Sequence, residues 1–201
     1  LRITRDLGRL LQREAAATAA INGMQQTITE ARQALAGAGL AGAPVVLGKF
    51  VGMGMGLRGF SDHSLAADVA GQLGLENQWH HSLPGRDFSH IQLPQMLALG
   101  NVHLIIFGDD SDETALMQRS AIWPQLAFVR RNQVYRVANS WGFGGPVSAS
   151  LLAQRISLLA QLPLQVLGRE RLEVRARDQT LLAARLLGLR LRVGVRVGVR
   201  V

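Results

Sequence analysis

Short apolar segments alternate with helix-like segments along this chain, and this alternation constrains the fold more than any other feature. Residues 45–51 and 102–107 are almost continuously apolar, and residues 134–137 alternate apolar and polar side chains. Continuous apolar runs of this length are typical of strands buried on both faces. The sequence therefore predicts an α/β fold with a Rossmann-like, mostly parallel sheet and helices on both of its faces.

Helical periodicity fills most of the intervals between these strands. The expected helices are residues 61–74, 89–99, a segment beginning at 109–112, and 147–162. Ser61 or Asp62 is expected to cap the first of them. Ser89 and Gln92, three residues apart, form a capping-box signature at the start of the second.

Residues 4–37 have a heptad-like apolar stripe that predicts one long helix, interrupted in pattern at Glu14 and ended by Gly37 and Gly39. Such a helix would be roughly 50 Å long at about 1.5 Å per residue, which is longer than a small domain needs. It lacks a clear charge pattern at the e and g positions, so a strut across two packed bodies is favoured over a coiled coil. Residues 1–40 are assigned to this helix and residues 41–163 to an α/β lobe.

The positive charge of the chain is concentrated at its carboxyl-terminal end. The 201 residues carry a formal net charge of +8. Residues 165–201 hold nine arginines against three acidic residues, which leaves thirteen basic and eleven acidic residues elsewhere. The body is nearly neutral, so nucleic acid is not expected as a partner. Residues 164–201 are predicted to be a basic low-complexity tail outside the domain, and translated repetitive or out-of-frame DNA is favoured over a membrane or nucleic-acid arm.

A glycine-rich segment, Gly54–Gly59, matches the dinucleotide-binding pattern G-x-G-x-x-G. Phe60, Ser61 and Asp62, the last two being the candidate caps, stand between its last glycine and the body of the next predicted helix, and no second strand ends in an acidic residue about 20 positions later. A hairpin-like excursion beside a ligand cleft is therefore favoured, with Met55 and Arg58 at its edge as candidate ligand contacts. The alternatives are an NAD(P)-binding oxidoreductase domain that uses Gly54–Gly59 and a surface loop without a ligand.

The chain offers no convincing catalytic set. It contains no cysteine, which excludes disulfides and thiolate metal sites. The polar residues His80, His81, Asp87 and His90 match no compact metal-ligand spacing. The G-x-S-x-G pattern is absent, and no Ser/His/Asp arrangement has supporting context. We therefore predict no catalytic residue, no metal ligand and no enzymatic activity.

Two aromatic residues, Trp141 and Phe143, follow the last predicted strand and lie among three glycines. Gly145 and Pro146 then open a helix, since proline is tolerated in a first helical turn. Ligands of open α/β sheets bind outside the carboxyl ends of the strands. The segment therefore predicts a recognition loop with Trp141 and Phe143 as an aromatic wall; a loop whose aromatics cap the core is the alternative.

Several segments in sequence order resemble the carboxyl-terminal part of the periplasmic iron-siderophore-binding proteins of ABC importers, with the iron(III)-hydroxamate binders closest. These segments are the long helix, the strand at 45–51, residues 74–79, residues 89–93, the strand at 102–107, residues 123–137 and the loop at 141–145. No single segment is unique to that family, so the resemblance depends on their order across residues 1–160.

The resemblance implies a two-lobed binder joined by a rigid long helix, with a ferric siderophore, preferably of the hydroxamate type, held between the lobes. This chain would be a fragment with the linking helix and the second lobe, without the amino-terminal lobe or a signal peptide. The protein would be a periplasmic monomer that delivers its ligand to an inner-membrane permease. It would need no cofactor, because the siderophore itself carries the iron.

In the family, the loop that matches Trp141 and Phe143 faces the cleft and packs on the siderophore. The chelating oxygens already satisfy the iron, so the protein needs aromatic walls and a few hydrogen-bond donors. Arg58 is the candidate donor from this lobe. A binder of haem, cobalamin or a metal ion with the same fold is a further alternative.

Overall fold

A computed structural model describes residues 1–51, 56–108, 112–139 and 143–161. The chain divides into two compact units, residues 1–170 and 171–201, and all of the described residues belong to the first unit. The predicted tail at 164–201 lies outside the described residues, as do the candidate ligand contacts Met55 and Trp141.

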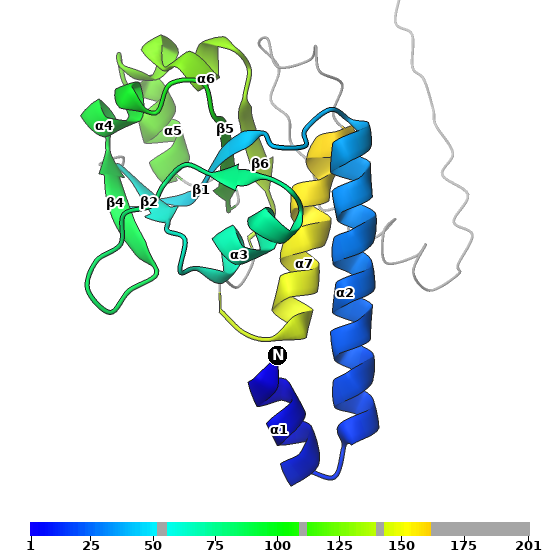
Figure 1. The fold of residues 1–201 in the computed structure, drawn as a ribbon. Coiled ribbons are helices and arrows are strands. Elements are labelled where there is room, and N and C mark those ends of the chain that lie inside the picture. Colours follow the sequence, from blue (N-terminus) through cyan, green and yellow to red (C-terminus); the bar gives the residue numbers. More distant parts are fainter. Residues whose placement is uncertain (52–55, 109–111, 140–142, 162–201) are drawn as a thin grey trace, which may run out of the picture. The chain divides into compact units, whose positions relative to one another are not determined.

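In the described part of the chain, a six-stranded mixed sheet organises the first unit (Figure 1). Its strands are β1 (Pro44–Val51), β2 (Gly56–Phe60), β3 (Glu76–Asn77), β4 (Phe88–Gln92), β5 (His103–Phe107) and β6 (Val134–Val137). The order is β4-β2-β1-β5-β6, and the short β3 pairs with the first residues of β1. The β1–β3, β1–β5 and β5–β6 pairs are parallel, whereas β2 runs antiparallel to β1 and β4. The prediction of an α/β lobe with a mostly parallel sheet is confirmed.

Helices cover both faces of this sheet (Figure 1). One face packs against α2 (Glu14–Gly37), α3 (Leu65–Gln72) and α7 (Pro146–Ser157), and α2 lies along α7. The other face packs against α4 (Leu93–Ala98), α5 (Asp112–Arg119), the 3-10 turn η1 (Trp123–Gln125) and α6 (Ala127–Arg130). A second 3-10 turn, η2 (Leu158–Gln161), continues α7. Among the described residues, no helix combines the length and apolarity needed to cross a membrane.

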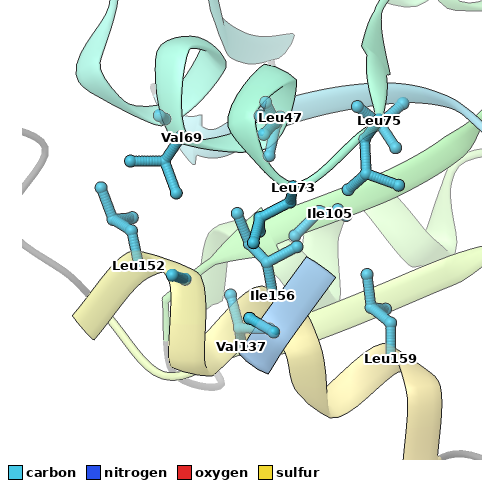
Figure 2. Close-up of a cluster of buried hydrophobic side chains, with 14 of the residues drawn as sticks. Leu47, Val69, Leu73, Leu75, Ile105, Val137, Leu152, Ile156 and Leu159 are labelled. Atoms are coloured by element: carbon cyan, nitrogen blue, oxygen red, sulfur yellow. The ribbon is translucent and has the colours of Figure 1, made fainter. Parts of the chain in front are cut away.

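Successive residues of the central strands enter opposite cores. In β5, Ile105 and Phe107 join the core beneath α2, α3 and α7, whereas Leu104 and Ile106 join the core beneath α4, α5 and α6. Figure 2 shows Ile105 of β5 near Leu73, which directly follows α3, and Ile156 of α7. This alternation into two cores explains why the predicted strands are almost continuously apolar.

The prediction of one continuous helix over residues 4–37 is wrong. The structure has α1 (Arg2–Leu10) and α2, separated by a turn in which Gln12 adopts a left-handed φ of 54°. The backbone N–H of Arg13 donates to the carbonyl of Gly8 at 2.7 Å and closes this turn. A Cβ at Gly8 would lie 2.6 Å from the Cβ of Ala17, so α1 folds back tightly onto α2. The interrupted stripe at Glu14 marks this turn.

Two predicted helix starts are also corrected. The cap of α3 is Ser64, whose Oγ accepts from the Ala67 N–H at 3.0 Å, and not Ser61 or Asp62. Ser89 lies within β4 and does not start a helix; α4 begins only after Gln92, whose N–H donates to the Gln95 side chain at 2.8 Å. Strand pairing with β2 therefore overrides the local capping-box signature at Ser89.

The glycine-rich segment leads into an antiparallel hairpin between β1 and β2. Gly56 and Gly59 both lie within β2, and Gly48 of β1 pairs directly with Gly59. A Cβ at Gly48 would lie 2.7 Å from the Arg58 carbonyl oxygen, so the two strands approach too closely for a side chain there. Because β2 is a strand and not the start of a helix, the geometry of a dinucleotide-binding turn is absent from residues 56–60.

Candidate ligand site

The three mutually parallel strands β1, β5 and β6 end at the same edge of the sheet. Val51, Phe107 and Val137 are their last residues, and the strands are neighbours in the order β1-β5-β6. The backbone takes a φ of 144° at Gly108, directly after β5. The carboxyl edge of parallel strands is where open α/β sheets bind ligands, so the candidate site is placed there.

Phe143 lies six residues after the end of β6 and is 52% exposed, unlike the buried aromatic residues Trp123, Phe128 and Tyr135 earlier in the same stretch. Gly144 has a φ of 129°, a conformation that residues with a side chain rarely adopt, and its Cβ position would lie 2.6 Å from the Ser148 Oγ. Gly145 precedes α7 and Pro146 is its first residue, as the sequence predicts. The described end of the loop is therefore held closely to the start of α7.

Arg155, a residue that the sequence analysis did not single out, holds the other described end of this loop. Its guanidinium donates to the backbone carbonyls of Ala138, at 3.1 Å, and Asn139. These residues directly follow β6, so an arginine on α7 fixes the path of the chain as it leaves the sheet. The contact joins residues 16 and 17 positions apart, and a local sequence pattern gives no signal for it.

Arg58 lies in the middle of β2, close to the hairpin end of the sheet. Its Cα partners are Lys49 on β1 and His90 on β4, so three basic residues form one row across three strands. Alternation places this row on the same face as Leu47, the face covered further along by α2, α3 and α7. The guanidinium carbon of Arg58 lies 4.5 Å from the ring centroid of Phe88.

A second arginine, Arg86, contacts the same aromatic ring, with its guanidinium carbon 5.5 Å from the Phe88 centroid. Arg86 and His90 are exposed, while Lys49, Arg58 and Phe88 are half-buried. The structure therefore surrounds Arg58 with basic and aromatic groups that sequence reasoning missed. Only the pairing of β2 with β4, about 30 residues apart in sequence, brings these side chains together.

The loop histidines have structural partners. His80 Nδ1 lies 2.8 Å from Asp62 Oδ2, and Asn77 donates to the other Asp62 oxygen at 2.8 Å. Partial desolvation acts to raise the pKa of Asp62, but the hydrogen bonds from Asn77 and His80 and the charges of His80 and His63 outweigh it, so this pKa is lowered. Among the described residues, no group of three histidine or acidic side chains is placed to hold a metal ion.

Trp79 ties the same loop to the sheet. Its indole N–H donates to the Ser89 Oγ at 2.9 Å, and the Ser89 hydroxyl donates to the His81 carbonyl at 2.8 Å. Ser89 therefore anchors the loop between β3 and β4. A depression of about 430 Å³ nearby is lined by Asp62, Ala67, Asp68, Gly71, Gln72 and Asn77. Asp62 and Asp68 are already hydrogen-bonded there, to Asn77 and Gln72 respectively.

The fold and the edge site define a class of structure, an open α/β lobe with a long helix packed along its closing helix. No protein-family model matches the chain. Solved structures do match it: siderophore-binding protein FhuD from Vibrio cholerae, bound to Fe3+-Desferal, has a TM-score of 0.70 at 22% identity over 82% of this chain. The chain covers 60% of that protein.

Two further siderophore binders have the same fold. The periplasmic binding protein from the fuscachelin gene cluster of Thermobifida fusca has a TM-score of 0.61 at 16% identity, over 78% of this chain and 58% of that one. Staphylococcus aureus FhuD2 with ferrioxamine B has a TM-score of 0.61 at 12% identity, over 78% and 62%. The predicted resemblance is confirmed at the level of the fold, and the chain spans about three fifths of the length of these neighbours.

Proposed function

We propose that this chain is a ligand-binding lobe of a solute-binding protein that takes up ferric siderophores, without catalysis, and delivers them to an ABC-importer permease. The observation that carries the proposal is the agreement of its fold with the FhuD structure over 82% of the chain. The neighbours with Fe3+-Desferal and ferrioxamine B support a hydroxamate-type ligand. As a member of that class it would act in the periplasm, as a monomer.

The ligand would lie against the carboxyl edge of the sheet, with Trp141 and Phe143 as one wall and Arg58 and Met55 beside it. Exposure of Phe143, while Trp123, Phe128 and Tyr135 are buried, supports this placement. A large exposed aromatic surface is a common anchor for a bulky ligand. Iron would arrive already chelated, so the protein would supply no iron ligand of its own.

The opposite wall would come from a second lobe outside these 201 residues. Two observations support this arrangement: the chain spans about three fifths of its neighbours, and α1 exposes a set of large apolar side chains. These are Ile3 at 75%, Leu7 at 50% and Leu10 at 78% exposure. A contiguous exposed apolar surface is typical of a face that another body covers.

The antiparallel β1–β2 hairpin argues against the NAD(P)-binding alternative, because residues 56–60 form a strand where that site requires a helix start. A haem, cobalamin or metal-ion binder would share the fold. Competition binding between a ferric siderophore and haem, cobalamin or a free metal ion should distinguish these two kinds of binder.

Tryptophan fluorescence tests the proposal, because Trp79 and Trp123 are buried and Trp141 belongs to the proposed wall. Ferrioxamine B should quench the 201-residue chain in a saturable manner, and metal-free desferrioxamine B should not. Replacing Trp141→Leu should remove most of the ligand-dependent quenching, while the matched Trp123→Phe variant should retain it. Absence of saturable quenching by any ferric siderophore up to millimolar concentrations, or stronger quenching by haem or cobalamin, would contradict the proposal.

A further inference from the structure

Positively charged side chains gather at the corner of the sheet formed by β2 and β4. Arg58 and Arg86 both contact the Phe88 ring, at 4.5 and 5.5 Å, and Lys49 and His90 flank Arg58 on the neighbouring strands. Within the residues that the structure describes, no carboxylate forms an ion pair with Lys49, Arg58 or Arg86. Three cations therefore gather there, next to the imidazole of His90.

Such a grouping is unfavourable unless something compensates it. Each contact with the aromatic ring contributes about 0.5–1 kcal/mol at an exposed site, but like charges held close together repel one another. The Arg58 Nε is buried and has no hydrogen-bond acceptor among the described residues. Half-buried Lys49 and Arg58 keep part of their side chains accessible. An arginine that stacks on an aromatic ring and makes no ion pair among the described residues is suited to a carboxylate or another anion.

The position of the group connects it to the proposed ligand. Lys49 lies two residues before the end of β1, and a Cβ at Gly108, directly after β5, would lie 3.9 Å from the Lys49 Cε. Lys49 thus reaches the carboxyl edge where the chain leaves β5, and Arg58 is its direct neighbour in the sheet. The basic row runs from this edge onto the β2–β4 corner.

We propose that Lys49, Arg58, Arg86 and His90, gathered around Phe88, form an anion-recognition patch that selects ferric siderophores carrying negatively charged groups over cationic ones. The inference rests on the proposed siderophore-binding function and specifies the charge of its ligand. A hydroxamate chelate with a free carboxylate fits the patch, whereas the protonated amine of ferrioxamine B is repelled by it.

Three ferric siderophores with the same iron-chelating groups but different net charges test this inference directly. Ferrioxamine B, its N-acetyl derivative and its N-succinyl derivative share the chelating groups and end in an ammonium, a neutral amide and a carboxylate. We expect the affinity of the 201-residue chain to rise in that order, by about tenfold from the cation to the anion, and the difference to shrink as salt rises from about 0.05 to about 0.5 M.

Neutral variants locate the effect. Arg86→Gln should remove a large part of the preference, leaving affinity for the N-acetyl compound within about twofold of wild type. Arg58→Gln should also remove a large part of the preference, and it should weaken binding of all three compounds, because Arg58 is the proposed hydrogen-bond donor to the ligand. The matched control Arg131→Gln removes an exposed arginine next to α6, a helix of the opposite sheet face, and should leave the preference intact. Circular dichroism checks that every variant is folded.

The two proposals fail separately in this experiment. If the three compounds bind with equal affinity, or if the Arg58 and Arg86 variants keep the full preference, the anion-recognition patch is wrong and siderophore binding stands. If none of the three binds, the proposed function itself is contradicted.

Discussion

The two halves of the sheet differ in what their residues face. In β5, Leu104 and Ile105 are both fully buried, one in each core, because helices cover both faces there. In β2, Leu57 is fully buried, whereas its neighbour Arg58 on the other face is only half-buried and belongs to a basic, aromatic group. Helices therefore bury both faces of β5, whereas the face of β2 that carries Arg58 stays polar beside the proposed ligand.

The largest expected effect separates two adjacent residues of β2. Leu57→Ala should reduce the free energy of unfolding by about 2–5 kcal/mol, because it opens a cavity in the core shared with Ile91 and Phe50. Arg58→Gln should reduce it by less than about 1 kcal/mol, the scale of one cation–π contact. Urea unfolding followed by circular dichroism measures both. Similar losses for the two variants would show that the polar face also carries the fold.

The close approach of β1 and β2 gives the next effect. Gly48→Ala should destabilise the protein by about 1–3 kcal/mol, because the new Cβ would meet the Arg58 carbonyl at 2.7 Å and the Leu57 side chain. Gly71→Ala in α3 is the matched control, since nothing lies within 4 Å of its Cβ position. It should stabilise the protein by up to about 1 kcal/mol through helix propensity. A tolerated Gly48→Ala would mean that the hairpin is looser than described.

A smaller loss is expected at the amino terminus of α3. Ser64→Ala removes the acceptor for the Ala67 N–H and should cost about 1 kcal/mol. Ser82→Ala, at an exposed position in the loop before β4, should change the unfolding free energy by less than about 0.5 kcal/mol. Equal thermal midpoints for the two variants would exclude Ser64 as a capping residue.

The smallest effect concerns Asp62, which is half-exposed. Its pKa is lowered in the folded state, so its contribution to stability is present above the unfolded-state pKa and is lost as pH falls through the folded value. The difference in urea midpoint between wild type and Asp62→Asn should therefore shrink as pH drops from about 6 to about 3. A difference that stays constant over this range would contradict the contact with Asn77 and His80.

The central strands could be predicted from the sequence, because a strand that is buried on both faces has an almost continuous run of apolar residues. Residues 102–107 contain β5, and residues 134–137 match β6. The start of α7 followed from Gly145 and Pro146, whose backbone preferences are local. Features of this kind depend on short-range chemistry, which a single sequence carries.

Where the local structure depends on contacts between residues distant in the sequence, local sequence patterns predicted the wrong structure or predicted nothing. Ser89 and Gln92 carry a capping-box pattern, but pairing of His90 with Arg58 makes the segment a strand. Gln12, in the turn after α1, adopts a left-handed conformation, and no glycine or proline in the sequence predicts that turn. Arg58 was identified as a candidate contact, yet Arg86 and Phe88 joined it only through the β2–β4 pairing.

Residue-resolved NMR of the isotope-labelled chain, titrated with the diamagnetic gallium complex of N-succinyl-desferrioxamine B, tests the central claim most directly. The account predicts saturable shifts of the Phe143, Gly144 and Gly108 amides and of the Arg58 and Arg86 side chains, with the α2 and α7 interior unchanged. Saturable shifts confined to residues outside the carboxyl edge and the β2–β4 corner, or no shifts at millimolar ligand, would contradict it.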